Sequence, residues 1–254
     1  MKEMTVDCLQ IRVFGSEQAM GQSAARFVSG HLNEAIRQKG SANLILATGT
    51  SQFSFLDALK QEEVNWSCIT VFHLDEYLGL PIHHPASFRK YLKERILDEV
   101  KPAAVYLVNG DAPDPQREMA QYESLLKSHP VDIACIGIGE NGHIAFNDPP
   151  VANFQDPVWV KAVELDEACR RQPLGEGWFP DMASVPTHAM TLTIPAIMAS
   201  KVISCVVPGS RKATAVRNTL YGAIETRCPA SILRRHPQCT LFLDNASFPG
   251  AADE

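Results

Sequence analysis

Short runs of apolar and β-branched residues alternate with longer amphipathic segments along most of the chain. The apolar runs predict strands at 9–15, 42–48, 68–76, 104–110, 132–139, 190–194, 201–209 and 239–246. The amphipathic segments predict helices at 17–39, 53–60, 87–99, 116–127, 195–200 and 211–221. Because strands that alternate with helices usually pair in parallel, this order predicts an α/β fold: an open, mostly parallel sheet with helices on both faces.

The length, charge and hydropathy of the chain limit its domain number and the classes of partner that it can bind. Its 254 residues contain no internal repeat or low-complexity segment, and we predict a single domain over residues 1–254. The formal net charge of −6 argues against general nucleic-acid binding. No run reaches the roughly 18 apolar residues of a membrane span, and the N-terminus lacks the apolar stretch of a signal peptide. We therefore expect no membrane partner and a cytoplasmic location.

The seven cysteines are scattered along the chain, and no two of them form a CxxC pair. This spacing argues against a disulfide scaffold and against a zinc site. Several of them, such as Cys135 and Cys205, lie in apolar runs, where a thiol packs as a small hydrophobic side chain. His83 and His84 are the only adjacent histidines, and two neighbouring histidines rarely bind one metal ion. We therefore predict no metal site.

Polar clusters follow four of the predicted strands, after Ala47, Phe72, Ile136 and Val207. In an open α/β sheet, ligands bind beyond the carboxyl ends of the strands. Since the carboxyl ends of parallel strands share one edge of the sheet, we expect the four clusters to line a single crevice.

Two of these clusters have the composition of phosphate-binding turns. In ATGTSQ (47–52) a strand runs into a helix start, whose backbone N–H groups attract an anion. The candidate phosphate-binding residues here are Thr48, Gly49, Thr50 and Ser51. In PGSRK (208–212), Arg211 and Lys212 place positive charge at a helix N-terminus, which the helix dipole disfavours unless an anion binds there. Both patterns also fit plainer structures, a capped helix start and a solvated basic pair.

The cluster FHLDEYLGL (72–80) contains two adjacent carboxylates, Asp75 and Glu76. Neighbouring side chains of an extended chain point to opposite faces, so at most one of the two enters a given pocket, and the other is free to pair with a neighbouring residue. A carboxylate at the edge of a dry pocket can act as a general base. A solvated acidic loop is the alternative interpretation.

The remaining cluster, GIGENGHIAFNDP (137–149), surrounds His143 with glycines and with the polar residues Asn141, Asn147 and Asp148. Imidazole titrates near neutral pH and can carry protons, and the glycines allow the backbone to come close to a ligand. Together with the carboxylate and the phosphate-binding turns, this histidine predicts an enzyme that moves protons on a small phosphorylated molecule.

These segments resemble the glucosamine-6-phosphate deaminase (isomerase) family, which shares a superfamily with 6-phosphogluconolactonase. The matching motifs are LDEYLGLPIHHPASFRKYL (74–92), GIGENGHIAFNDP (137–149) and PGSRKATAVRNTLYG (208–222), and the likeness extends from about Leu44 to Asp244. The first motif favours the deaminase branch. The resemblance implies a Rossmann-like sheet of the deaminase/isomerase type and deamination of glucosamine 6-phosphate to fructose 6-phosphate and ammonium.

The resemblance also implies a role for each candidate residue. His143 would open the sugar ring, Asp75 would move a proton from C2 to C1, and Asn141 and Asp148 would orient and tune His143. No metal or redox cofactor is required by this chemistry. The phosphate would be bound by Thr48, Gly49, Thr50, Ser51, Lys212 and an arginine of the middle segment, with Arg170 as first choice and Arg171 as second.

The chain departs from the family at several positions. Asn141 stands where many members have aspartate, Asp148 stands where they have glutamate, and the turn reads TGTSQ instead of TGGTP. Pro157 and Trp159 lie near the position where allosterically activated members carry basic residues. We therefore do not expect activation by N-acetylglucosamine 6-phosphate.

The sequence leaves several alternatives open. The substrate could be galactosamine 6-phosphate, the reaction could be hydrolysis of 6-phosphogluconolactone, or the chain could be a sugar-phosphate sensor without activity. The segment near 165–181 is either a mobile lid or a static surface loop. The family ranges from monomers to hexamers, so the resemblance allows a homo-oligomer without fixing its size.

Overall fold

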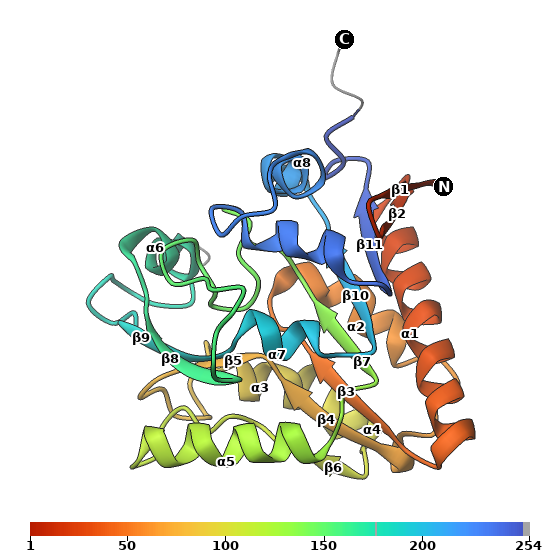
Figure 1. Cartoon of the computed structure of the whole chain (residues 1–254). Helices are drawn as coiled ribbons and strands as arrows, with labels where there is room; N and C mark the ends of the chain where they lie inside the picture. Colours follow the sequence, from red (N-terminus) through yellow and green to blue (C-terminus); the bar gives the residue numbers. More distant parts are fainter. Residues whose placement is uncertain (176, 251–254) are drawn as a thin grey trace.

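A central sheet of eight strands runs through the computed structural model, which describes residues 1–175 and 177–250 (Figure 1). Its strand order is β1-β2-β11-β10-β7-β3-β4-β6, and every neighbouring pair is parallel except the β1–β2 hairpin. The strands are β1 (Lys2–Val6), β2 (Leu9–Phe14), β3 (Ala42–Leu46), β4 (Ile69–His73), β6 (Ala104–Val105), β7 (Ile133–Ile136), β10 (Val202–Val207) and β11 (Cys239–Asp244). The predicted α/β fold with a mostly parallel sheet is confirmed. Residue 176, within the predicted lid, and residues 251–254 lie outside the described residues.

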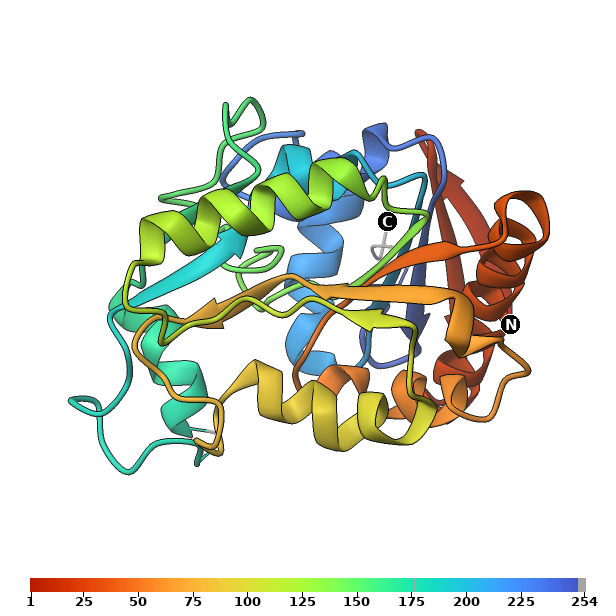
Figure 2. The same ribbon diagram turned by 90° about the horizontal axis from the view of Figure 1, so that it is seen from below.

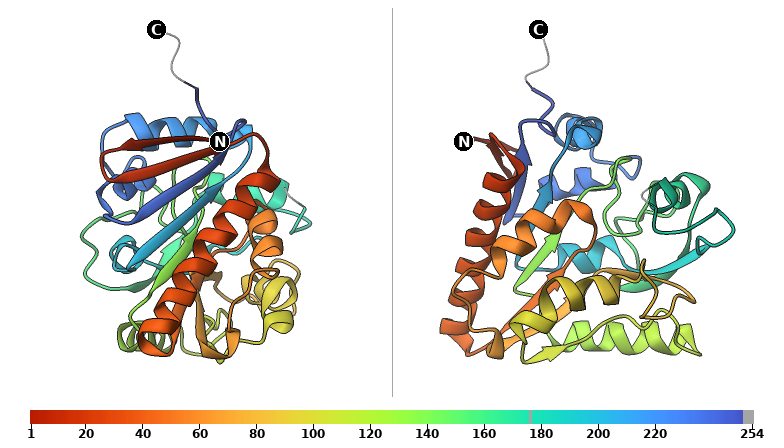
Figure 3. Two further views of the ribbon diagram at one scale, coloured as in Figure 1. Left: turned by 90° about the vertical axis from the view of Figure 1, so that its right-hand side faces the viewer. Right: turned by 180° about the vertical axis from the view of Figure 1, so that it is seen from behind.

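Each face of the sheet is covered by its own apolar layer, because successive side chains of a strand point to opposite faces. In β3, Leu44 and Leu46 belong to one layer and Ile45 to the other. The first layer packs under α1 (Glu17–Lys39), α2 (Phe53–Leu59), α3 (Phe88–Leu92), the π-helical turn η3 (Lys93–Leu97) and α4 (Asp98–Val100). The second packs under α5 (Pro115–Ser128), α7 (Ile194–Met198), α8 (Ala213–Tyr221) and the 3-10 helix η5 (Pro229–Arg235). Figure 2 shows α5 and the α3–α4 segment on opposite sides of β4, and Figure 3 shows α1 and α2 together on one face.

A second, smaller sheet lies beside the carboxyl ends of the main strands. It consists of β5 (Asp75–Tyr77), β9 (His188–Leu192) and β8 (Val160–Glu164), antiparallel and in the order β5-β9-β8. The prediction of one strand over 68–76 is therefore wrong, because β4 ends at His73 and Asp75 pairs with Thr191 in the second sheet. Of the strand predicted at 190–194, residues 190–192 belong to β9 in this sheet and not to the main one, and Ile194 begins α7. Local periodicity cannot show which distant strand a segment will pair with.

Several elements differ from the predictions for local reasons. The strand expected at 104–110 pairs only over Ala104–Val105. The sequence analysis did not predict β1, β8, η5 or α6 (Glu167–Gly175). In α6, Pro173 interrupts the helical pattern, and β1 is largely exposed, so neither segment has a clear apolar period.

The bounds predicted for the first helix, 17–39, agree with those of α1 because both ends carry strong local signals. The side chain of Ser16 accepts a hydrogen bond from the backbone N–H of Ala19 at 3.2 Å, as a helix N-cap does. Gly40 ends the helix with a φ of 80°, and its N–H donates to the carbonyl of Ile36. Glycine adopts this left-handed conformation without the steric penalty that other residues meet.

Gly21 allows α1 to pack closely on α2, and this contact gives a first prediction. A Cβ at Gly21 would lie 2.6 Å from the carbonyl carbon of Ser54, whereas a Cβ at Gly30 in the same helix would meet nothing within 4 Å. Gly21→Ala should therefore lower the free energy of unfolding, although alanine is the better helix former. Gly30→Ala should raise it by roughly 0.5–1 kcal/mol. Urea denaturation of both variants tests the contact, and equal effects of the two substitutions would contradict it.

Candidate active site

A cavity of about 530 Å³ opens at the carboxyl ends of β3, β4, β7 and β10. This volume is typical of small-molecule sites. All four polar clusters contribute to its wall, through 48–51, Leu74 and Asp75, 137–140 with His143, and 208–212. The expectation that the clusters meet in one crevice is therefore confirmed. The second sheet and α6 complete the wall with Tyr77, Cys169 and Pro173.

His143 lies in the cavity wall and is supported from behind by two polar side chains. Its Nδ1 lies 2.9 Å from Oδ1 of Asp148. Asn141 donates from Nδ2 to the same oxygen at 2.8 Å, and its Oδ1 accepts a hydrogen bond from the backbone N–H of His143 at 3.0 Å. Neither Asn141 nor Asp148 is among the described residues that line the cavity. Both residues are therefore placed to support His143 and not to line the cavity themselves.

Gly139 allows the imidazole of His143 to lie directly over the backbone. A Cβ at this position would come within 2.4 Å of three ring atoms of His143. Gly139 also donates its N–H to the carbonyl of His143 at 2.9 Å, which closes the turn. Gly139 thus brings the backbone of this segment close to the histidine ring.

The carboxyl group of Asp148 is held in its charged form. Burial by itself raises the pKa of Asp148, but the contacts with His143, Asn141 and the thiol of Cys169 outweigh it. The pKa of Asp148 therefore lies below its ordinary value. A carboxylate in this position can stabilise a protonated imidazole.

Asp75 has the opposite electrostatic environment, although its carboxyl group belongs to the same cavity. It is 7% exposed and lies at the start of β5. Burial raises the pKa of Asp75 well above its ordinary value, and the charges of Glu76 and Asp148 raise it further. A carboxylate with a raised pKa is a stronger base than an ordinary aspartate, which suits it to proton transfer at carbon.

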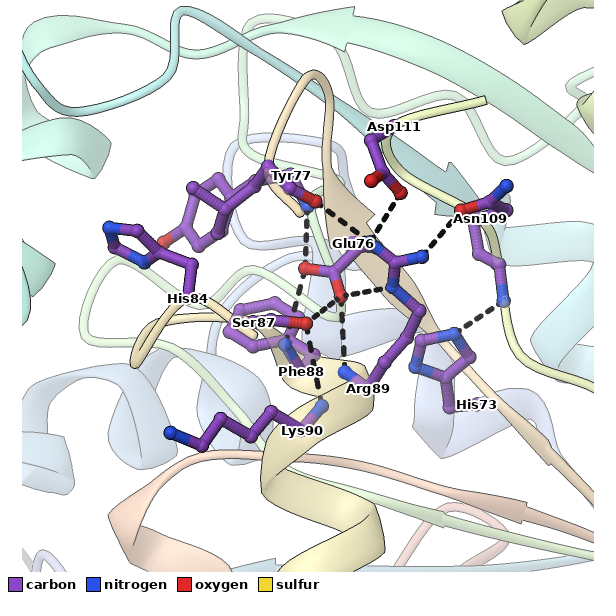
Figure 4. A network of polar contacts seen from close by, with 12 residues as sticks. His73, Glu76, Tyr77, His84, Ser87, Phe88, Arg89, Lys90, Asn109 and Asp111 are labelled. Carbon is purple, nitrogen blue, oxygen red and sulfur yellow. Dashed lines mark hydrogen bonds and ion pairs between the residues drawn. The ribbon is translucent and has the colours of Figure 1, made fainter. Parts of the chain in front are cut away.

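Glu76 is not among the described residues that line the cavity, and it forms the centre of a buried polar network (Figure 4). Its carboxylate accepts hydrogen bonds from the hydroxyl of Ser87 at 2.8 Å and from the backbone N–H of Arg89 at 3.0 Å, at the start of α3. The guanidinium of Arg89 lies 3.2 Å from the same carboxylate and 2.9 Å from that of Asp111, and it also contacts Asn109. This confirms the expectation that the two adjacent acids face different surroundings. The network fixes β5, and with it Asp75, against α3.

The two turns predicted to bind phosphate have similar backbone geometry. Gly49 has a φ of 102° and precedes the 3-10 helix η1 (Thr50–Gln52), and Gly209 has a φ of 89° and precedes η4 (Ser210–Lys212). Each turn joins a strand of the main sheet to a helix, and the first N–H groups of a helix have no acceptor within it. The hydroxyl of Tyr91 donates to the carbonyl of Gly49 at 2.8 Å, a support that the sequence analysis did not identify.

The two arginines proposed for the phosphate have other contacts. Arg170 donates from Nη2 to the carbonyls of Met182 and Val185 at 2.7 and 2.8 Å, and Arg171 pairs with Glu167 on the surface. Neither arginine is among the described residues of the cavity wall, whereas Arg211 and Lys212 both are. The phosphate contact of Arg170 therefore stays a prediction.

Four cavity residues with a charged or thiol side chain were not among the chosen site residues: Glu17, Glu140, Cys169 and Arg211. Arg211 and Glu140 lie in motifs that the sequence analysis had singled out. Cys169 lies in α6, which has no clear pattern in the sequence. In the described part of the chain, no group of three or more His, Cys, Asp or Glu side chains could hold a metal ion. None of the helices described there has the length and apolar character to cross a membrane.

Comparison with known proteins agrees with this arrangement. Residues 15–242 match the family model described as glucosamine-6-phosphate isomerases/6-phosphogluconolactonase. A glucosamine-6-phosphate deaminase of an Exiguobacterium species is 39% identical over 222 residues, 87% of this chain and 85% of that protein. The solved structure of a monomeric glucosamine-6-phosphate deaminase superposes with a TM-score of 0.85 and 33% identity, covering 93% of this chain and 98% of that one. A 6-phosphogluconolactonase structure from Shewanella baltica, 18% identical with a TM-score of 0.76 and coverage of 95% and 98%, shares the fold.

The network around Glu76 gives a prediction for stability. Glu76→Gln leaves the side chain of Arg89, only 7% exposed, without its most buried counter-charge. We expect the free energy of unfolding in urea to fall by about 3 kcal/mol. Glu94→Gln removes an acid from an exposed pair with Lys90 on the adjoining helical turn and serves as the control, for which we expect little change. A loss no larger than that of the control would show that the buried pair does not hold β5 against α3.

Proposed function

Because the chain belongs to the glucosamine-6-phosphate isomerase/6-phosphogluconolactonase family, we propose that it deaminates glucosamine 6-phosphate to fructose 6-phosphate and ammonium. The relatives described above that exceed 30% identity have this activity in their names. The observation that carries the proposal is the pair of proton-transfer groups, Asp75 and His143, on one cavity wall that also includes the two phosphate-type turns.

Ring opening is the first step of the proposed mechanism. The imidazole of His143 takes the proton of the anomeric hydroxyl and gives it to the ring oxygen, the bond between C1 and the ring oxygen breaks, and the sugar becomes an open-chain aldehyde. Asp148, held as a carboxylate, stabilises the imidazolium that forms on the way. Asn141 fixes the orientation of Asp148 through its amide nitrogen and that of the His143 backbone through its amide oxygen.

Proton transfer between two carbons is the second step, and it needs a base that later becomes an acid. The carboxylate of Asp75 takes the proton from C2, and the substrate's ammonium group gives a proton to the aldehyde oxygen, so that an enolamine forms. Asp75 then returns its proton to C1, which gives the protonated imine of the ketose. Water then adds to C2, the carbon–nitrogen bond breaks, and ammonium leaves with fructose 6-phosphate. The raised pKa of Asp75 suits both halves of this transfer.

Phosphate binding completes the proposal. Thr48, Gly49, Thr50 and Ser51 would bind the phosphate with backbone and hydroxyl groups, Lys212 would add its charge, and Arg170 would join them by leaving its carbonyl partners. A cytoplasmic location is part of the proposal and suits the cysteines, all of which are free thiols. The oligomeric state is left open.

Replacement of Asp75 tests the proposed reaction. Asp75→Asn should lower the rate of ammonium release from glucosamine 6-phosphate roughly 10²–10⁴-fold, because the amide cannot take up the C2 proton. Asp98→Asn, on the exposed surface of α4, should leave the rate unchanged. Galactosamine 6-phosphate and 6-phosphogluconolactone are tested as alternative substrates beside glucosamine 6-phosphate. The result would contradict the proposal if the wild type hydrolysed the lactone and released no ammonium, and if Asp75→Asn kept the lactone hydrolysis. The chain would then be assigned to the lactonase reaction.

The pH dependence of kcat/KM gives a second test. Asp75 must be a carboxylate to act as the base, so activity falls as the pH drops through its pKa. Since that pKa is raised, the acid limb should lie well above pH 4, the ordinary range of aspartate. The substrate phosphate also titrates, near pH 6. The affinity for fructose 6-phosphate is therefore measured over the same pH range, and kcat/KM is corrected for the change in binding. An acid limb centred near pH 4 would contradict the role of Asp75.

A further inference from the structure

The cavity wall contains few positive charges for a ligand that carries a phosphate. Its charged side chains among the described residues are Glu17, Asp75, Glu140, Arg211 and Lys212. The phosphate group of a sugar phosphate brings a charge of about −1.5 to −2 at pH 7. Three carboxyl groups already belong to this wall, so binding depends strongly on its two cations.

Arg211 is placed at the turn that leads into α8, next to the proposed phosphate site. Arg211 lies in η4, two residues after Gly209, and α8 begins two residues after Arg211, at Ala213. Positive charge at this end of a helix is unfavourable unless an anion lies beside it. The anion beside Arg211 is Glu140, whose Oε1 accepts a hydrogen bond from Nε of Arg211 at 2.7 Å.

The pair formed by Arg211 and Glu140 can exchange partners easily. The side chain of Arg211 is 67% exposed and that of Glu140 is 41% exposed, so water screens their attraction. The two residues follow neighbouring strands, β10 and β7, and both line the cavity. A phosphate bound at the 208–212 turn would offer the guanidinium two oxygens and a larger charge than the carboxylate does.

We infer that Arg211 is a phosphate-binding residue of this site and that Glu140 competes with the phosphate for it. The inference rests on the proposed function, since it assigns a part of that substrate's binding site. Phosphate binding moves the guanidinium from the carboxylate to the phosphate oxygens, and Glu140 turns outward because two anions repel each other. A sugar without the phosphate would leave the Arg211–Glu140 pair in place, so the exchange selects phosphorylated sugars.

Calorimetry with fructose 6-phosphate tests the exchange without relying on turnover. Arg211→Ala should weaken binding about tenfold to hundredfold, because a charge-assisted hydrogen bond to the phosphate is lost. Glu140→Gln should tighten binding severalfold, since the competitor is removed. In the double variant, Glu140→Gln should no longer tighten binding. Arg217→Ala serves as the control, because Arg217 is also an exposed arginine but does not line the cavity. This substitution should change the Kd less than twofold.

Thermal unfolding checks that each variant is folded, which is expected because both side chains are exposed. An Arg211→Ala variant that binds as tightly as the wild type overturns the inference. An unchanged Kd in Glu140→Gln overturns the competition. If the wild type binds fructose 6-phosphate and loses affinity in Arg211→Ala but releases no ammonium from glucosamine 6-phosphate, the proposed function fails and the inference stands. A wild type that binds no hexose 6-phosphate overturns both.

Discussion

Parallel pairing of the strands is the constraint on which the site depends. Because β3, β4, β7 and β10 run in the same direction, the chain must leave all of them at one edge of the sheet. The four polar segments that follow these strands are far apart in the sequence and yet face one cavity. The apolar layers on the two faces hold the strands in this order, so the position of the site follows from the packing of the sheet.

Two buried carboxyl groups near this edge are driven to opposite protonation behaviour by their neighbours. Asp148 contacts His143 and Asn141, and its pKa lies below the ordinary value. Asp75 has burial and the charges of Glu76 and Asp148 beside it, and its pKa lies above the ordinary value. One group therefore stays charged while the other can exchange a proton, which is the division of roles that acid–base catalysis needs.

The structure explains how adjacent acids can serve different purposes. Asp75 and Glu76 point in opposite directions from β5, as the geometry of extended chain requires. The outward acid is neutralised by Arg89 and the start of α3, and in return it anchors the strand that carries the inward one. This arrangement stabilises Asp75 in a position that its own unfavourable burial would otherwise oppose.

The fold class could be predicted from the residues alone, as could the bounds of elements with strong local signals, such as α1, and the four polar segments of the site. Caps, apolar periods and strand ends are local properties of the chain. The motifs around Asp75 and His143 also indicated the family. Three other features became visible only in the folded chain: β4 ends before Asp75, Glu76 pairs with Arg89, and Arg170 binds the carbonyls of Met182 and Val185. These features depend on contacts between residues separated in the chain, and such contacts leave no pattern in the local sequence. The same holds for the burial that raises the pKa of Asp75.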